Sequence, residues 1–202
     1  MAGKRRSVRA DLLRAAMELF AVGGSRGTSL AAIADKIGVT TPSITHHFGT
    51  KEALLLEIVA ELDRSDMAVP RNAVTTDHFI ADVRRWAISL RSDPAWTNLI
   101  RLRAVMVAEA LDPSCPAHAH FVARHRLVRH DLAGVVERGQ LEGVIRGEID
   151  PLLLAGEIAG FCQGVQIQWL LDPDEFPIAD VVDAYLERLL SDLTPAARHP
   201  SL

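Results

Sequence analysis

Apolar residues recur at three- and four-residue steps over most of the chain, which is the period of an amphipathic helix. The pattern is most informative over residues 28–51, TSLAAIADKIGVTTPSITHHFGTK. One apolar stripe there is formed by Leu30, Ile33, Ala34 and Ile37. Gly38 is expected to end this first helix, because glycine adopts the left-handed conformation that closes a helix. In the next helix only Ile44 and Phe48 are apolar and in register, so the segment predicts two short helices joined by a turn.

The second of these helices leaves small and polar side chains on its outer surface at the leading end. We expect Thr40 to cap it by accepting a hydrogen bond from the Ser43 amide, with Pro42 in the first turn, where no N–H is needed. The outward positions are Thr41, Pro42, Ser43, Thr45, His46 and His47. A helix-turn-helix that presents hydrogen-bonding groups in this way suits insertion into the major groove of DNA.

Glycines and Asp-Pro pairs divide the rest of the chain into further helices. Gly23 and Gly24 end a helix predicted over 8–22, and Thr50 is expected to cap one over 51–67. Asp-Pro pairs begin at positions 93, 112, 150 and 172, and each joins a capping or turn residue to a proline that cannot continue a helix. The later helices are expected at 76–92, 95–111, 116–140, 150–171 and 177–193. The sequence therefore predicts an all-α fold of about nine helices.

A change in composition over residues 68–76, AVPRNAVTT, marks the expected connection between two domains. The first, 1–55, would be a three-helix DNA-binding domain, with the helix over 51–67 as a link. The second, 68–202, would be wholly helical.

Composition narrows the class of protein. Hydrophobic residues make up 49% of the chain and aromatic residues 5%, which favours helices packed on helices. Cys115 and Cys162 fit neither a metal-ligand spacing nor a disulfide framework, so a reduced cytoplasmic setting is expected. No apolar run reaches membrane-spanning length, and the basic N-terminus runs into a charged helix rather than a secretory signal.

The net charge of −4 is unevenly distributed along the chain. Residues 1–55 hold eight basic and four acidic side chains, whereas the remainder hold 14 basic and 22 acidic ones. A basic head on an acidic body is typical of a protein that meets DNA with one end, although charge also fluctuates along chains without function. The arm Lys4–Arg6 either contacts phosphate or the minor groove, or is a solvated tail.

At LLRAAMELFAVGGSRGTSLAAIADKIGVTTPSITHHFGTKEALLLEIV, the chain resembles the N-terminal DNA-binding domain of TetR-type bacterial transcriptional regulators. The resemblance covers about residues 8–60 without a gap and implies a set of DNA contacts. These are Thr28, Ser29, Thr40, Thr41, Pro42, Ser43, Thr45, His46, His47 and Lys51, with base contacts at 41–43 and a phosphate contact at 51. Thr45 stands where the family most often has tyrosine, and Ala31 where relatives frequently carry a charge. Both departures affect the expected sequence preference rather than the DNA-binding role.

The C-terminal part also resembles a domain type found among these regulators. The resemblance lies in PAHAHF, GVIRGEIDP, GFCQGVQIQWLLDPDEFPI and VVDAYLERLL. It implies that residues 68–202 form a ligand-binding and dimerisation domain, in which the last two helices pair with those of a second subunit. The protein would then be a homodimer that reads an inverted-repeat operator, because a twofold axis gives two half-sites of opposite orientation.

Glycines support such an interface in the helix predicted over 150–171. Gly156, Gly160 and Gly164 fall at four-residue steps on one line, where each costs about 0.5–1 kcal/mol relative to alanine. Another backbone is therefore expected to come close, from the partner or from this chain. The last helix offers an apolar stripe that suits either the same interface or the intrachain core, formed by Ile178, Val181, Val182, Tyr185, Leu189 and Leu190.

Large or polar residues that interrupt the aliphatic helices are candidates for an effector pocket. They are Phe79, Trp86, Trp96, Met106, Phe121, His125, Cys162, Gln163, Gln166 and Trp169. An apolar cavity with a few convergent polar groups is the usual form of such a site, while ordinary core packing is the alternative for each aromatic residue. The expected effector is a small, largely apolar molecule.

Together these features predict a sequence-specific DNA-binding regulator, most simply a ligand-responsive repressor. A metal-responsive regulator is one alternative, because His118, His120, His125 and His130 lie near one another in sequence, although their steps do not gather them into one ligand set. A helical interaction module without DNA binding is another. No phosphate loop, nucleophile elbow or paired acid suggests an enzyme or a cofactor.

Overall fold

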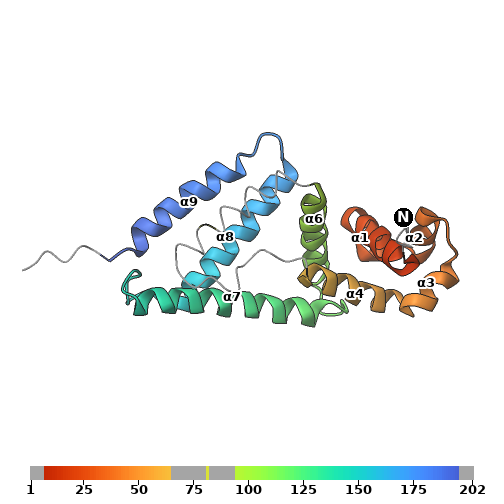
Figure 1. The fold of residues 1–202 in the computed structure, drawn as a ribbon, viewed down its shortest axis with the longest axis horizontal. Coiled ribbons are helices and arrows are strands. Elements are labelled where there is room, and N and C mark those ends of the chain that lie inside the picture. The colour runs from red at the N-terminus through yellow and green to blue at the C-terminus, as the bar shows by residue number, and fades with distance from the viewer. Residues whose placement is uncertain (1–6, 65–80, 82–93, 196–202) are drawn as a thin grey trace, which may run out of the picture. The chain divides into compact units, whose positions relative to one another are not determined.

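The computed structural model describes residues 7–64, 81 and 94–195 of the chain (Figure 1). Within these ranges it contains eight helices and no strand, which confirms the all-α fold. The helices are α1 (Val8–Gly27), α2 (Leu30–Ile37), α3 (Thr41–Phe48), α4 (Lys51–Arg64), α6 (Pro94–Glu109), α7 (His118–Leu141), α8 (Pro151–Leu171) and α9 (Ile178–Leu193). The helix predicted over 76–92 and the connection at 68–76 lie outside the described residues, apart from position 81. None of the described helices has the length and hydropathy needed to cross a membrane.

The described residues fall into two compact units. The first contains α1 to α4 together with α6 and the first residues of α7, up to position 123. The second contains the remainder of α7 with α8 and α9. Residues 95–111, which we assigned from sequence to the C-terminal domain, therefore belong to the first unit, because α6 lies along α1.

Most helix ends follow from local sequence. Gly38 ends α2 with φ 72°, and the Thr50 hydroxyl accepts a hydrogen bond from the Ala53 amide at 3.1 Å, as predicted. Asp150 caps α8 through the amides of residues 152 and 153. The prediction for Thr40 was wrong in one respect, because its backbone carbonyl rather than its hydroxyl accepts from the Ser43 amide, at 2.9 Å.

The core of the first unit is built around α1. Its most deeply buried side chains are Leu12, Phe20, Ile33, Ile44, Leu54, Ile58, Leu102 and Met106, each no more than 1% exposed. Because every helix of the unit except α7 contributes to this list, the short helices α2 and α3 are held by tertiary packing rather than by their own length. The helix-turn-helix is therefore fixed on a rigid support.

In the second unit α8 and α9 lie side by side (Figure 1). Phe161 of α8 stacks on Tyr185 of α9, with ring centroids 3.7 Å apart and planes 11° from parallel. The turn between α7 and α8 is closed by Gln140, whose side-chain amide donates to the carbonyls of Arg146 and Ile149 at 3.0 and 2.8 Å. The Arg146 amide in turn donates to the Leu193 carbonyl at 2.9 Å, which ties this turn to the end of α9.

Candidate nucleic-acid interface

The orientation of α3 is set by two buried side chains on its inner face. Ile44 is 1% exposed and Phe48 is 8% exposed, and both belong to the core of the first unit. Pro42 lies in the first turn of α3, where its missing N–H costs nothing. With this face buried, Pro42, Thr45 and His46 are exposed, and Thr41, Ser43 and His47 are half-buried.

The outer surface of α3 thus carries hydroxyl and imidazole groups but no residue of fixed charge. The rings of His46 and His47 meet edge to face, with centroids 5.2 Å apart. Such groups can donate to and accept from base edges in a major groove. This surface is therefore better suited to reading base edges than to attracting phosphates by charge.

Thr45 has a more restricted role than its position suggested. Its hydroxyl donates to the Pro42 carbonyl of its own helix at 3.0 Å. The single hydroxyl proton is used there, so in this arrangement the oxygen can only accept a hydrogen bond. A phosphate oxygen also only accepts, and Thr45 therefore cannot replace the phenol-to-phosphate contact without leaving this bond.

Thr28 does not lie on the exposed surface, which corrects its assignment as a DNA contact. The residue is 6% exposed, and its hydroxyl donates to the Gly24 carbonyl at 2.8 Å. It therefore supports the junction of α1 and α2. Ser29 is exposed, and its hydroxyl oxygen caps α2 by accepting from the Ala32 amide at 3.0 Å, which leaves the hydroxyl proton free to donate to a phosphate.

Most basic side chains of the first unit's DNA-binding part are neutralised by neighbouring carboxylates. The pairs are Arg9 with Glu57 at 2.8 Å, Arg14 with Asp11, Arg26 with Asp112 at 2.5 Å, Lys36 with Glu18 at 3.1 Å and Arg64 with Glu61 at 2.6 Å. Arg9 also lies over the Phe48 ring, 4.9 Å from its centroid. Of the six basic residues within 7–64, only Lys51 makes no ion pair in the described part of the chain.

Lys51 occupies the first position of α4, directly after the Thr50 cap and three residues beyond the end of α3. A helix N-terminus and an ammonium group together attract an anion. Lys51 also borders a cleft of about 370 Å³ whose other walls include Arg26, Asp112 and Ser114. Its charge has no ion-pair partner among the described residues, and the phosphate contact at Lys51 stays a prediction.

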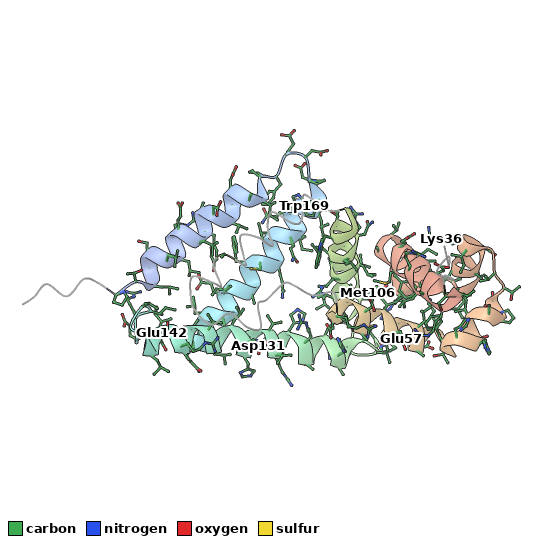
Figure 2. The ribbon with its side chains drawn as sticks, viewed as in Figure 1. Lys36, Glu57, Met106, Asp131, Glu142 and Trp169 are labelled. Carbon is green, nitrogen blue, oxygen red and sulfur yellow. The ribbon has the colours of Figure 1, made fainter. Side chains whose placement is uncertain are left out.

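The predicted pocket residues are scattered among different environments. Met106 on α6 (labelled in Figure 2) is 1% exposed, and Phe121 is 7% exposed; both belong to the core of the first unit, the alternative we gave for them. Trp96, His125 and Gln166 are half-buried, and Gln163 is exposed. Phe79 and Trp86 lie outside the described residues. None of the predicted pocket residues that the structure describes lines the cleft beside Lys51 or the apolar cavity of about 20 Å³ between α7, α8 and α9.

Two of these residues on α8 have unusual surroundings. Trp169 is 3% exposed, and its indole N–H has no hydrogen-bond partner in the part of the chain that the structure describes. An unpaired buried donor costs free energy, so this group is available to a ligand. Burial raises the pKa of the Cys162 thiol to about 12, which keeps it protonated and unreactive at neutral pH.

No described residue covers the glycines of α8. A Cβ added to Gly156, Gly160 or Gly164 would meet no atom of the described residues within 4 Å. Large apolar side chains flank them on the same helical stripe, with exposed fractions of 74% for Leu153, 46% for Ile167 and 80% for Leu171. These three were not among the predicted interface residues, although their three- and four-residue steps from the glycines place them on this face.

On α9, three of the six residues in the predicted apolar stripe face inward. Leu189 is 9% exposed, and Ile178 and Val182 are buried in the chain's own core, which leaves them little surface for a partner. Val181 and Tyr185 are half-buried. Burial raises the pKa of Tyr185 well above its ordinary value, and its hydroxyl has no partner among the described residues.

Two histidines at the start of α7, His118 and His120, make tertiary contacts. Nδ1 of His118 lies 2.7 Å from the Ala110 carbonyl, and Nε2 of His120 lies 3.0 Å from a carboxylate oxygen of Asp63. Within residues 7–64 and 94–195, no group of three or more His, Cys, Asp or Glu side chains is arranged to hold a metal ion.

Known proteins share both the helix-turn-helix and the wider fold. Residues 12–58 match the family model described as "Bacterial regulatory proteins, tetR family". The HTH-type transcriptional regulator TtgR of Pseudomonas putida is 26% identical over 201 residues, which cover 94% of each protein.

Two solved structures have the same fold at lower identity. The ketosteroid transcriptional regulator KstR2 of Mycobacterium tuberculosis has a TM-score of 0.69 at 23% identity, over 96% of this chain and 99% of that one. SmeT, the repressor of the Stenotrophomonas maltophilia multidrug efflux pump SmeDEF, has a TM-score of 0.74 at 20% identity, over 95% of this chain and 93% of that one. The family match falls on the residues that form α1 to α4, so residues 12–58 are similar to the DNA-binding domain of the tetR family of bacterial regulatory proteins, and the chain is a DNA-binding transcriptional regulator.

Proposed function

We propose that this regulator is a ligand-responsive repressor that binds an inverted-repeat operator as a homodimer. The observation that carries the proposal is the pairing of an uncharged, hydrogen-bonding surface on α3 with one unpaired cation, Lys51, at the start of the next helix. In this arrangement α3 reads base edges while Lys51 and the exposed Ser29 hold phosphates. The arm Lys4–Arg6, which lies outside the described residues, is proposed to add sequence-independent attraction.

The proposed dimer forms through the glycine face of α8. Open space over Gly156, Gly160 and Gly164 shows that no described part of this chain takes the position of the expected close neighbour. The flanking leucines would leave water when a second α8 packs there, at about 25 cal/mol for each Å² of apolar surface buried. Val181 and Tyr185 of α9 are proposed to complete the interface.

A twofold axis through this interface determines the form of the operator. The two α3 helices must then read half-sites of opposite orientation, with centres about 34–36 Å apart or somewhat more. We infer that the operator is an inverted repeat and that a single half-site binds weakly.

The effector is proposed to be a small, largely apolar molecule. Trp169 supplies an unpaired indole N–H beside aliphatic residues of α8, and Gln166 on the same helix supplies a half-buried amide. One related structure is named for ketosteroids and another for repression of a multidrug efflux pump, which agrees with an apolar effector. Bound ligand lowers DNA affinity only by the difference in its affinity for the two states of the dimer.

We propose no catalytic role, since the family consists of regulators and the site is a reading surface. A protein that binds the bacterial chromosome acts in the cytoplasm, and this location is part of the same proposal. Membrane and cofactor partners are not expected.

Duplex DNA from the region upstream of the chain's own gene tests the proposal. Fluorescence anisotropy should show two chains per duplex and an affinity that falls steeply with salt. Small apolar compounds that raise the melting temperature of the protein should then weaken this binding. Compounds that stabilise the protein strongly but leave DNA affinity unchanged would refute ligand-responsive repression.

A further inference from the structure

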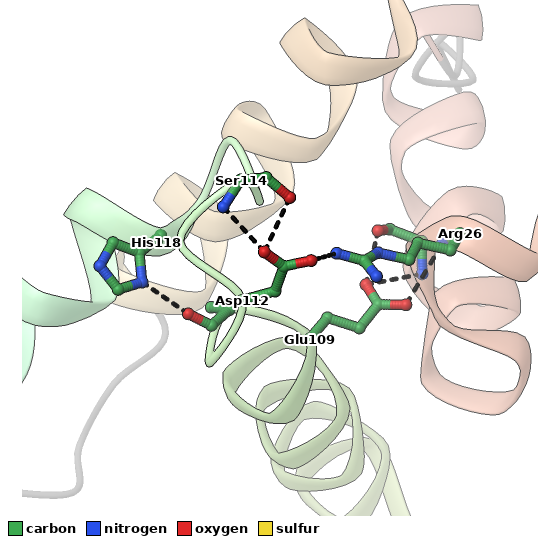
Figure 3. Close-up of polar contacts among 7 residues, drawn as sticks. Arg26, Glu109, Asp112, Ser114 and His118 are labelled. Carbon is green, nitrogen blue, oxygen red and sulfur yellow. Dashed lines mark hydrogen bonds and ion pairs between the residues drawn. The ribbon is translucent and has the colours of Figure 1, made fainter.

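The end of α1 is joined to the end of α6 by one carboxylate (Figure 3). α1 breaks at Gly24, where φ is 70° and ψ is 172°, and a short segment to Gly27 follows. Oε2 of Glu109 accepts hydrogen bonds from the Ser25 amide at 3.1 Å and the Ser25 hydroxyl at 2.5 Å, and Oε1 accepts from the Arg26 amide at 3.2 Å. Glu109 thus caps the short segment from outside its own helix.

Glycine is required at the break for two reasons. The positive φ of Gly24 is a conformation that other residues rarely adopt. In addition, a Cβ at this position would overlap Oε1 of Glu109. The absence of a side chain is therefore what lets the carboxylate reach the backbone amides.

A second set of contacts extends from this corner to α7. Asp112 binds the Arg26 guanidinium at 2.5 Å, and its other oxygen accepts from the amide and hydroxyl of Ser114 at 2.9 and 2.7 Å. These donors lower the pKa of Asp112 well below its ordinary range. His118, the first residue of α7, donates from Nδ1 to the Ala110 carbonyl on the other side of the same turn.

The backbone at the end of α1 would bend easily without these hydrogen bonds. Gly23, Gly24 and Gly27 all lie within it, and α2 begins three residues after the last of them. A shift at this corner moves the start of α2, and the core through which α2 and α3 pack on α1 must adjust with it. The Glu109 contacts remove that freedom, because a half-buried charged acceptor with three donors is held more firmly than a neutral one.

We propose that Glu109 is a positioning residue for DNA binding. It fixes the angle between the helix-turn-helix and the α6–α7 turn, so that the two α3 helices of a dimer hold one half-site spacing. Base reading within a half-site does not depend on it. This inference rests on the proposed dimeric function, and its test separates the two.

The test uses duplexes that carry two copies of the preferred half-site in inverted orientation, with their separation varied one base pair at a time. Each added base pair moves one half-site by about 3.4 Å and rotates it by about 35°. Wild-type protein should show one sharp optimum. The Glu109→Gln variant should keep the same base preference within a half-site, while its penalty for a one-base-pair shift becomes at least about fivefold smaller.

Two further variants control this result. Glu61→Gln makes the same chemical change in an exposed ion pair of α4 and should keep the wild-type spacing profile. Gly24→Ala displaces the carboxylate from the opposite side of the contact and should reproduce the broad profile of Glu109→Gln. Melting temperatures of all variants report whether each remains folded under the conditions of the binding measurement.

The possible outcomes separate the two proposals. If Glu109→Gln is folded and keeps the sharp optimum, or weakens binding equally at every spacing, the positioning role is wrong and Glu109 is only a structural cap. If wild-type protein binds single half-sites as tightly as inverted repeats, the dimeric function and the positioning role both fail.

Discussion

The leading end of α3 and the glycine face of α8 are both exposed, but they expose different chemistry. α3 shows hydroxyl and imidazole groups on an otherwise uncharged surface. On α8, no described residue covers Gly156, Gly160 and Gly164, which lie between protruding leucines. Hydrogen-bonding groups of several kinds can match base edges, whereas a bare backbone flanked by apolar side chains can match only another close-packed helix. The two surfaces are therefore suited to different partners.

DNA binding by α3 depends on the proposed dimer interface of α8. Intrachain carboxylates pair most of the cations near α3, so a single head holds DNA mainly through Lys51 and its short polar side chains. When two weakly binding DNA-binding domains are linked in a dimer, binding of the second half-site becomes intramolecular. The affinity of the dimer for DNA is therefore higher than that of a single domain. We therefore expect changes on α8 to affect DNA binding more than any single change on α3.

Bulk on the glycine face should have the largest effect. Gly160→Phe fills space that no described residue of the subunit occupies, so the subunit should fold normally while the dimer is lost. DNA affinity should fall by about 100-fold or more, because avidity contributes about that much. Light scattering and anisotropy measure the two effects. Gly147→Phe, at another glycine with open surroundings, should change neither; a dimeric Gly160→Phe would remove this face from the interface.

Loss of the unpaired cation should come next. Lys51→Gln should weaken binding to every duplex by about tenfold and reduce the salt slope by about one ion. Lys36→Gln removes a cation that Glu18 already pairs at 3.1 Å, so its effect should be clearly smaller. Salt titrations of both variants give the comparison, and a Lys51 effect confined to one base position would contradict the phosphate role.

Loss of a single reading group should affect one base pair. Ser43→Ala should change preference at one position of each half-site by about fivefold, within the range of a base-edge hydrogen bond. Affinity for non-specific DNA should stay the same. A scan of single base-pair changes measures this, and uniform weakening across all sites would show that Ser43 does not read a base.

Helix caps in the head should differ in their effect on stability. Thr50→Ala removes a hydroxyl that accepts from the Ala53 amide and should lower the free energy of unfolding by about 1 kcal/mol. Thr40→Ala removes a hydroxyl with no capping bond and should cost clearly less. Urea denaturation compares the two, and an equal loss would mean that the Thr40 hydroxyl does cap α3 in solution.

The smallest expected effect concerns the pH dependence of the Arg26–Asp112 pair. Its contacts lower the pKa of Asp112 in the folded state, so their stabilisation is fully present above the ordinary carboxyl pKa and is lost as the pH falls through the lowered one. The stability difference between wild type and Asp112→Asn should stay constant from pH 7 to about pH 5 and shrink below about pH 4. A difference that already shrinks above pH 5 would contradict the lowered pKa.

The sequence predicted those features of the fold that depend on residues close together along the chain. The apolar steps of α2 and α3, the turn at Gly38 and the caps at Thr50 and Asp150 each depend on residues a few positions apart. The buried role of Thr28 was missed because it depends on how α1 breaks at Gly24.

Tertiary contacts set the remaining assignments. Met106 and Phe121 interrupt their helices in the way that pocket residues do, but they fill the core beside α1. The bond from Glu109 to Ser25 joins residues 84 positions apart, and no periodicity connects them. Only the double glycine at 23 and 24 marked that corner, and it indicated a helix end rather than a carboxylate site.

A random-sequence selection with the protein tests most directly how this regulator reads DNA. We predict enrichment of one inverted repeat, with half-site centres about 34–36 Å apart or somewhat more and two chains on each duplex. Enrichment of an unrepeated half-site bound by one chain, or of no sequence at all, would contradict it.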